Sequence, residues 1–106
     1  MHAPLQLRKT PIATDGCSVA LAGELDLATA PQLRTAIGTL LGTGCRHVVL
    51  DLSETTFLDS SGLGALVWAA HRMRSAGGDF SVVHPNPAIV PTLEVTGVGP
   101  VLALDG

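Results

Sequence analysis

The sequence predicts an α/β fold, a mixed sheet of four to five strands with helices packed against it. Short runs rich in apolar and β-branched residues alternate with longer segments whose apolar residues recur at helical spacing. Hydrophobic residues make up 46% of the chain and charged residues 14%, which is typical of a compact protein rather than a disordered one. The length of 106 residues suits one domain, residues 1–106, around a single core.

The first half of the chain predicts a β-hairpin, a helix and a central strand. Residues 5–10 and 17–23 are expected as strands, because they flank the turn-like segment PIATDG. From Thr29 onward apolar residues recur at helical spacing, with Pro31 tolerated in the first turn and glycines marking the end. The segment HVVLDL, residues 47–52, is apolar nearly throughout, which predicts a strand covered on both faces.

The second half predicts another helix between two strands. After a short loop, a helix is expected over about residues 60–76, followed by a strand over 79–84 that is parallel to the strand over 47–52. A third helix fits residues 88–96, and VLAL at 101–104 is expected as an edge strand. The apolar stripe of the middle helix consists of Leu63, Leu66, Val67, Ala70 and Met73.

Charge and cysteine content argue against several function classes. The net charge is −3 and the chain has one lysine and scattered arginines, so we expect no nucleic-acid partner. The N-terminus lacks the pattern of a signal peptide and no apolar run approaches the roughly 18 residues that span a bilayer, so we expect a cytoplasmic protein without a membrane partner. Cys17 and Cys45 lie outside any CxxC spacing, and we expect small buried thiols rather than a disulfide or a metal site.

The segment FLDSSGLGAL, residues 57–66, contains paired serines whose role must be explained. A nucleophile elbow needs Gly-x-Ser-x-Gly, but Leu58 and Asp59 stand where its first glycine belongs. A phosphate-binding loop needs a third glycine or Gly-Lys-Ser/Thr, and neither is present. A phosphoaspartate site at Asp51 would need clustered acids and a lysine on a later strand, whereas the one lysine is near the N-terminus. We therefore expect no enzymatic activity, no cofactor and no metal.

Local chemistry leaves two interpretations of the serines open. Asp59, Ser60 or Ser61 can cap the helix by accepting hydrogen bonds from its first turn, which is worth about 1 kcal/mol. Alternatively, the extra serine and the open glycines after it present a hydroxyl to a partner protein at the helix N-terminus. The helix dipole also favours an added phosphate at that position.

Two segments closely resemble the STAS domain of bacterial anti-sigma factor antagonists. They are LAGELDLATAPQLR, residues 21–34, and VVLDLSETTFLDSSGLGAL, residues 48–66, and the resemblance continues through NPAIVPTLEVTGV. It implies that the unmodified protein binds an anti-sigma factor with serine kinase activity and thereby frees a sigma factor. Phosphorylation by that kinase abolishes binding, and a serine phosphatase restores it. ATP and magnesium would belong to the kinase.

The resemblance also implies roles for individual residues. Ser60, which directly follows the aspartate, is the expected phosphorylation acceptor, and Ser61 is the alternative. Asp26 and Asp59 resemble positions that contribute to the partner surface. Both Asp26 and Ser60 follow predicted strands and lead into helices, so we expect them on one surface of the protein.

Four further residues are candidates for the partner surface. Gly62 and Gly64 would keep the serine accessible, and Leu63 would either anchor the helix in the core or touch the partner. Helical geometry places Trp68 away from the apolar stripe, on the side shared with Ser61, Ala65 and Arg72. We expect Trp68 to be partly exposed and to be a candidate interface anchor.

The chain departs from the family pattern at two places. Pro91 stands where an ordinary helix former is expected, so the third helix is expected to begin late. The chain stops at Gly106, where many family members continue into another helix, so a sheet face or edge is expected to be less covered and the protein to be a monomer or a weak homodimer. The alternative function is a STAS-type module that senses a small ligand, a nucleotide or a lipid, or serves as a scaffold.

Overall fold

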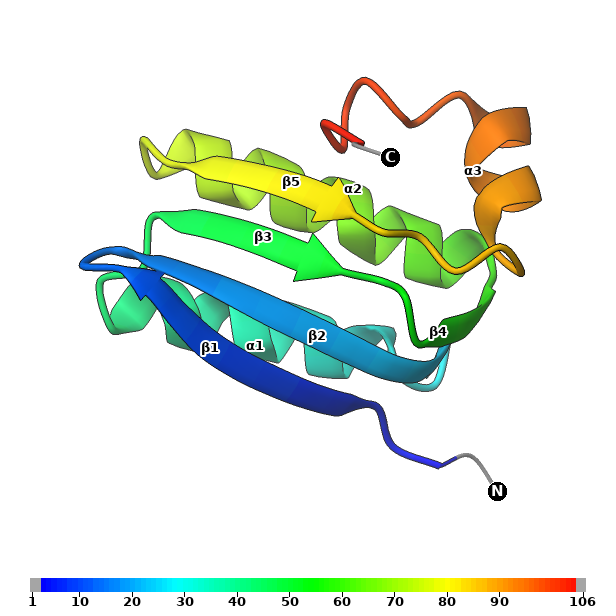
Figure 1. The fold of residues 1–106 in the computed structure, drawn as a ribbon, viewed down its shortest axis with the longest axis horizontal. Coiled ribbons are helices and arrows are strands. Elements are labelled where there is room, and N and C mark those ends of the chain that lie inside the picture. Colours follow the sequence, from blue (N-terminus) through cyan, green and yellow to red (C-terminus); the bar gives the residue numbers. More distant parts are fainter. Residues whose placement is uncertain (1–2, 105–106) are drawn as a thin grey trace.

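The computed structural model describes residues 3–104 and has the predicted fold class, a mixed sheet with helices packed against it (Figure 1). None of its helices is long and apolar enough to cross a membrane within these residues. Its elements, in chain order, are β1 (Gln6–Ala13), β2 (Gly16–Leu25), α1 (Ala30–Gly42), β3 (His47–Asp51), β4 (Thr55–Leu58), α2 (Ser60–Ser75), β5 (Asp79–Val83) and α3 (Val90–Thr96).

The sheet is organised around β2, which has three neighbours. Its order is β1-β2-β3-β5, and β4 pairs separately with β2. The β1–β2 hairpin is antiparallel, while β2–β3, β2–β4 and β3–β5 are parallel. The first half of β2, up to Ala20, pairs with β3, and its last residues, from Gly23, pair with β4. Between the two pairings the buried Thr55 hydroxyl donates a hydrogen bond to the Leu21 carbonyl at 2.7 Å, which satisfies that carbonyl in the interior.

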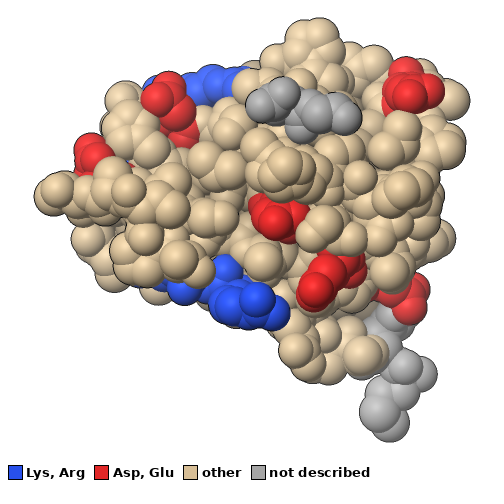
Figure 2. All heavy atoms as spheres, in the orientation of Figure 1, with Lys and Arg blue, Asp and Glu red and all other residues tan. Residues whose placement is uncertain are grey.

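Both long helices lie behind the same face of the sheet (Figure 1). The prediction that β3 is covered on both faces is therefore wrong. Burial alternates along β3: Val48 and Leu50 are buried under the helices, whereas Val49 and Asp51 are only half-buried on the other face. Figure 2 shows that other face, which is largely uncharged, with acidic side chains spread over it and basic ones at two margins. An apolar strand sequence does not by itself reveal how many faces are covered.

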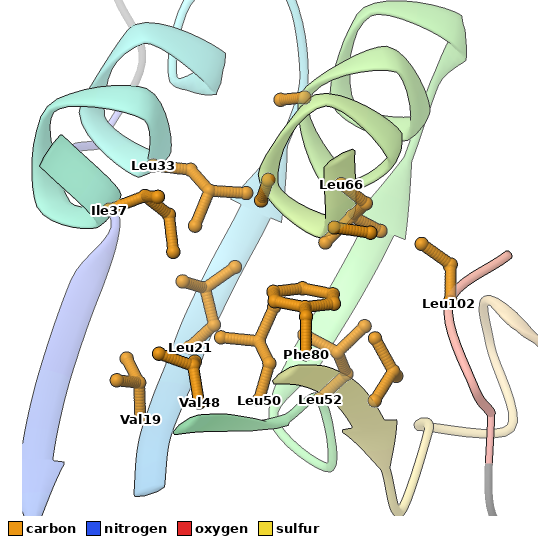
Figure 3. Close-up of a cluster of buried hydrophobic side chains, with 14 of the residues drawn as sticks. Val19, Leu21, Leu33, Ile37, Val48, Leu50, Leu52, Leu66, Phe80 and Leu102 are labelled. Atoms are coloured by element: carbon orange, nitrogen blue, oxygen red, sulfur yellow. The ribbon is translucent and has the colours of Figure 1, made fainter. Parts of the chain in front are cut away.

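The core lies between this sheet and the two helices (Figure 3). The predicted stripe of α2 is correct for Leu66, Ala70 and Met73, which are buried, but Leu63 and Val67 are only partly buried. Ala65 and Ala69 are buried as well, because α2 packs against α1 in addition to the sheet. The buried face of α2 is thus wider than one stripe. Figure 3 labels the facing core residues Val19, Leu21, Leu33, Ile37, Val48, Leu50, Leu52, Leu66, Phe80 and Leu102.

Two strand boundaries in the first half differ from the prediction. Most of the segment PIATDG is strand rather than turn, because β1 continues to Ala13 with a bulge between Pro11 and Ala13. Only residues 14 and 15 form the turn. The strand β4 lies in what was expected to be a loop after residue 52. It is four residues long and only its end residues are buried, so it lacks a simple alternating pattern.

The C-terminal elements are also shorter than predicted. The helix α3 begins at Val90 rather than at residue 88, with Pro91 in its first turn, which agrees with the expected late start. The segment 101–104 is a turn and not an edge strand. Its Leu102 carbonyl accepts one hydrogen bond, from the Val82 N–H at 3.0 Å, and the Leu102 side chain is buried in the core. Burial of this side chain explains the apolar sequence without strand pairing.

The two cysteines are buried and reduced, as the sequence predicts. Cys17 lies near the start of β2 and Cys45 lies just before β3, with their sulfur atoms 2.7 Å apart in a hydrogen bond. Burial raises the pKa of Cys17 from 9.0 to about 11, and the neighbouring Cys45 thiol adds to this effect. Lys9 acts in the opposite direction and lowers the pKa. The neutral thiol is therefore the form that the folded protein favours.

We expect the stability of the protein to fall as the pH rises from about 9 to about 11. The Cys17 thiol ionises at its ordinary pKa of 9.0 in the unfolded chain but near 11 in the folded one, so the unfolded state gains stability over this interval. Urea unfolding between pH 7 and 11 measures the effect. The fall should be smaller in Cys17→Ala, and an identical pH profile in this variant would contradict the assignment.

Candidate functional site

The candidate site lies at the carboxyl ends of β2 and β4. Leu25 of β2 pairs with Leu58 of β4 in parallel register, so the residues that follow them, Asp26 and Asp59, lie at the same edge of the sheet. The backbone N–H of Asp59 donates to the Leu25 carbonyl at 3.4 Å. Ser60 follows directly as the first residue of α2. Asp26 and Ser60 therefore lie at the same end of the sheet, as expected, but only Ser60 is exposed and Asp26 is buried.

Asp59 is the N-cap of α2 and also bonds to the neighbouring loop. One carboxylate oxygen, Oδ1, accepts a hydrogen bond from the Gly62 N–H at 2.8 Å, and the other, Oδ2, accepts one from the Leu27 N–H at 3.2 Å. Of the three cap candidates in the sequence, the structure selects Asp59. Its carboxylate joins the start of α2 to the loop that leads into α1.

Asp26 organises that loop from inside. Its side chain is only 5% exposed, and its Oδ1 accepts hydrogen bonds from the backbone N–H groups of Ala28 at 3.0 Å and Thr29 at 3.1 Å. The Thr29 hydroxyl in turn donates to the Glu24 carbonyl at 2.6 Å. The Asp26 carboxylate thus fixes the conformation of the loop, and any effect of Asp26 on a partner reaches it mainly through the residues that this loop exposes.

The two serines differ in accessibility. Ser60 is exposed and Ser61 is half-buried. Because Asp59 serves as the cap, neither serine side chain forms a hydrogen bond with the rest of residues 3–104. The Ser60 hydroxyl is therefore available at the start of a helix, without a structural role that a modification would disrupt.

A hollow of about 400 Å³ adjoins Asp59, and two exposed apolar residues line it. They are Leu27, which is 74% exposed, and Phe57, which is 46% exposed. The acidic lining residues are Glu24, Asp26 and Asp59. The site therefore combines large apolar side chains with carboxylates, which is a composition suited to contact with a protein.

Sequence reasoning missed Leu27 and Phe57. Phe57 faces outward because β4 carries an irregular register: Thr55 pairs with Gly23 but Phe57 pairs with Glu24, which leaves Thr56 as an extra residue. This bulge buries Thr55 and Leu58 while exposing Phe57. Leu27 directly follows Asp26, and Phe57 lies two residues before Asp59. This closeness to the two aspartates is the one feature of the sequence that could have distinguished them from core residues.

The two glycines of the motif have different surroundings. A Cβ atom on Gly62 would overlap the carbonyl of Leu25, whereas a Cβ on Gly64 would meet nothing within 4 Å. Gly62 is buried where α2 begins against the end of β2, and Gly64 is exposed. Leu63 between them is partly buried against the core. Gly62 therefore permits close packing of the helix start, and only Gly64 leaves an open surface.

Trp68 lies on the same helix as the serines. It is 37% exposed, which confirms the expected partial exposure. The expectation that it shares its side with Ala65 is wrong, because Ala65 is fully buried against the core. Trp68 is eight residues after Ser60, about 12 Å along the helix axis. Its role as an interface anchor stays a prediction.

No group of three or more His, Cys, Asp or Glu side chains within residues 3–104 could hold a metal ion.

Comparison with known proteins gives the family. The model described as "Mlab, STAS domain" matches residues 9–103. The chain belongs to the STAS domain family. This match extends over every helix and over nearly the whole sheet, including both loops of the candidate site.

Relatives of this STAS domain are named as regulators of sigma factors. The anti-sigma F factor antagonist of Paenibacillus polymyxa is 33% identical over 81 residues, which are 76% of this chain and 69% of that protein. The crystal structure of an anti-sigma factor antagonist from Mycobacterium paratuberculosis is 29% identical, with a TM-score of 0.81 over 98% of this chain and 89% of that one. The Bacillus protein SpoIIAA has the same fold at 22% identity, and each of its two structures covers 95% of this chain. The unphosphorylated form has a TM-score of 0.77 over 89% of that chain. The phosphorylated form has a TM-score of 0.70 over 92% of that chain.

We expect Gly62→Ala and Gly64→Ala to have opposite effects on stability. The methyl group at position 62 meets the Leu25 carbonyl and should cost about 1–3 kcal/mol through displacement of the helix start. The same change at position 64 meets open space and should be neutral or stabilise the helix by up to about 1 kcal/mol. Urea unfolding of both variants measures the difference, and equal stabilities would contradict the packing role of Gly62.

Proposed function

We propose that this STAS domain, residues 1–106, is an anti-sigma factor antagonist that binds an anti-sigma factor through the surface around Ser60. The observation that carries the proposal is an exposed serine with no hydrogen bond of its own, at the start of α2 and beside a hollow lined by apolar and acidic side chains. The names of the relatives, anti-sigma F factor antagonist and anti-sigma-B factor antagonist, support it.

The apolar residues supply the binding energy in this proposal. Leu27, in the loop after β2, and Phe57, on β4, line one hollow, and a partner that covers them removes large apolar side chains from water. Glu24 and Asp59 border the same hollow, so the matching surface of the anti-sigma factor should carry basic side chains. Trp68 extends the contact along α2.

Phosphorylation of Ser60 is the proposed switch. A phosphate adds about −1.5 to −2 charges directly beside Asp59 and at the edge of the acidic hollow. The Ser60 hydroxyl forms no hydrogen bond with residues 3–104, so the added group changes the surface without unfolding the domain. Charge repulsion and lost contacts in the complex then weaken binding, with each 1.4 kcal/mol equal to a factor of about ten.

Ser60 is a better acceptor than Ser61 because it is exposed, whereas Ser61 is half-buried. The phosphoryl group would come from ATP bound to the anti-sigma factor, which acts as the serine kinase, and a separate phosphatase would remove it. The domain itself contributes no catalysis to this cycle. We propose that it acts in the cytoplasm as a monomer or weak homodimer.

We expect Ser60→Ala to abolish phosphorylation but to preserve binding to the anti-sigma factor. Its unfolding free energy should stay within about 0.5 kcal/mol of wild type, because Asp59 rather than Ser60 caps the helix. Ser60→Asp should fold equally well and bind at least about tenfold more weakly, because its charge lies at the contact. Binding, phosphate incorporation and thermal melts should be measured with the anti-sigma kinases of the same organism, and Ser61→Ala is the matched control.

Two outcomes would contradict this assignment. Full phosphate incorporation in Ser60→Ala, together with its loss in Ser61→Ala, would move the acceptor to Ser61. Absence of both binding and phosphate in the wild-type protein with every anti-sigma kinase tested would favour the ligand-sensing alternative. Thermal melts separate both results from a simple folding defect.

We expect Leu27→Ser and Phe57→Ser each to weaken anti-sigma factor binding by roughly 5- to 30-fold, since exposed apolar anchors cost more than 1 kcal/mol when removed from an interface. Isothermal titration measures this loss. Val95→Ser is the matched control, because Val95 is the most exposed large apolar residue, at 87%, and lies on α3 outside the hollow. If Leu27→Ser and Phe57→Ser bind the anti-sigma factor as tightly as Val95→Ser and the wild-type protein do, the hollow is not the binding surface.

A further inference from the structure

A second chemically distinct cluster lies at the other end of the sheet, where Cys17 and Cys45 meet. Cys17 is the second residue of β2, whereas Asp26 directly follows the end of that strand, so about 30 Å of extended chain separates the cysteines from the serine site. The two sulfur atoms are 2.7 Å apart and belong to segments 28 residues apart in sequence. The thiols therefore take no part in the proposed function.

The backbone around the two thiols is held by several hydrogen bonds. The N–H groups of Arg46 and His47 donate to the Asp15 carbonyl at 2.7 and 3.1 Å, and the Cys45 N–H donates to the Leu40 carbonyl at 2.9 Å. These bonds fix the segment before β3 against both the turn of the hairpin and the end of α1. The sulfur atoms are thus brought together by the fold and not by a chance rotamer.

Both cysteines are buried, at 3% and 5% exposed, but they border the surface. Both cysteines line a hollow of about 190 Å³ on the surface, together with Lys9, Asp15 and Thr43. The hollow lies between the hairpin turn and the segment after α1, so access does not require unfolding of the core. A lone buried thiol would be inert, but two thiols in contact beside a surface hollow have a defined reaction available.

We propose that Cys17 and Cys45 are a site of reversible oxidation, which a low-molecular-weight disulfide converts into an intramolecular disulfide bond. One cysteine thiolate attacks a sulfur of the small disulfide, forms a mixed disulfide and releases one small thiol. The second cysteine then attacks the protein sulfur of the mixed disulfide and releases the other small thiol. The protein loses two protons and two electrons, and the small disulfide gains them as it is reduced to two small thiols.

The fold requires little movement to accommodate the bond. A disulfide has a sulfur–sulfur distance of about 2.05 Å, so the two sulfur atoms need to approach each other by less than about 1 Å. The closed loop runs through the rest of β2, the Asp26 turn and all of α1. Closing a loop of this length restricts the unfolded chain, and the oxidised protein should therefore be more stable than the reduced one.

The oxidation should be slow at neutral pH. The raised pKa of Cys17 keeps its thiol protonated, and only the thiolate attacks a disulfide. The charged groups that border the hollow are Lys9 and Asp15, and of these Lys9 favours the Cys17 thiolate. Reaction at pH 8 to 9 is therefore the condition in which the site should be tested.

The test uses the whole reduced chain incubated with excess cystamine at pH 8.5, followed by removal of the reagent. Free thiols titrated in denaturant should fall from two to none, and the intact mass should decrease by two hydrogen atoms. Proteolysis should yield one peptide pair linked through Cys17 and Cys45. The melting temperature should rise by roughly 10 °C or more, and a reducing agent should reverse all of these changes.

Cys17→Ala and Cys45→Ala are the matched controls, each compared with itself before and after the oxidant, so that their intrinsic stability does not matter. Neither should gain thermal stability from the treatment. Two thiols that remain free in the wild-type protein, stable cystamine adducts on both cysteines, or a covalent dimer would each overturn the proposal. None of these results bears on Ser60, so failure here is distinguishable from failure of the proposed function.

Discussion

The two hydrogen bonds of the Asp59 carboxylate determine the shape of the candidate site. One oxygen caps α2 through Gly62 and the other holds the Leu27 N–H of the neighbouring loop, so a single side chain sets the position of the serine relative to the exposed leucine. The buried Asp26 carboxylate fixes the same loop from within. Both bonds by Asp59 depend on the parallel pairing of β2 with β4, which places the ends of these strands together.

The strand β2 connects the two chemically active regions of the molecule. Its carboxyl end leads into the loop beside Ser60, and its amino end carries Cys17 in contact with Cys45. Between them, β2 exchanges one partner strand for another, and the Thr55 hydroxyl satisfies the carbonyl left at the exchange point. The second partner, β4, is what carries Phe57 and Asp59 to the surface. A switch that acts by surface charge needs such a rigid support, because the domain does not have to change shape.

A cap formed by Asp59 separates folding from regulation in this motif. Had Ser60 been the cap, a phosphate on it would have removed a helix-stabilising contact as well as changing the surface charge. With the aspartate in that role, the adjacent Ser60 is exposed and its hydroxyl forms no hydrogen bond within the described part of the chain. The close packing of Gly62 on Leu25 adds to the rigidity, because the helix start cannot shift without a clash. In the proposed switch, this rigid site would contact the partner when Ser60 is unmodified and repel it when Ser60 is phosphorylated.

The fold class, the β3–α2–β5 crossover and the placement of the motif at a helix start could all be predicted from the sequence, because apolar periodicity and glycine positions are local signals. Its resemblance to the STAS family also singled out Ser60, Asp26 and Asp59. The three-dimensional fold was needed to learn that Asp59, and not one of the two serines, caps the helix, that Asp26 is buried, and that Leu27 and Phe57 line one hollow. The reason is physical: a bulge in β4 and its pairing with β2 decide these outcomes, and both depend on contacts between segments about 30 residues apart.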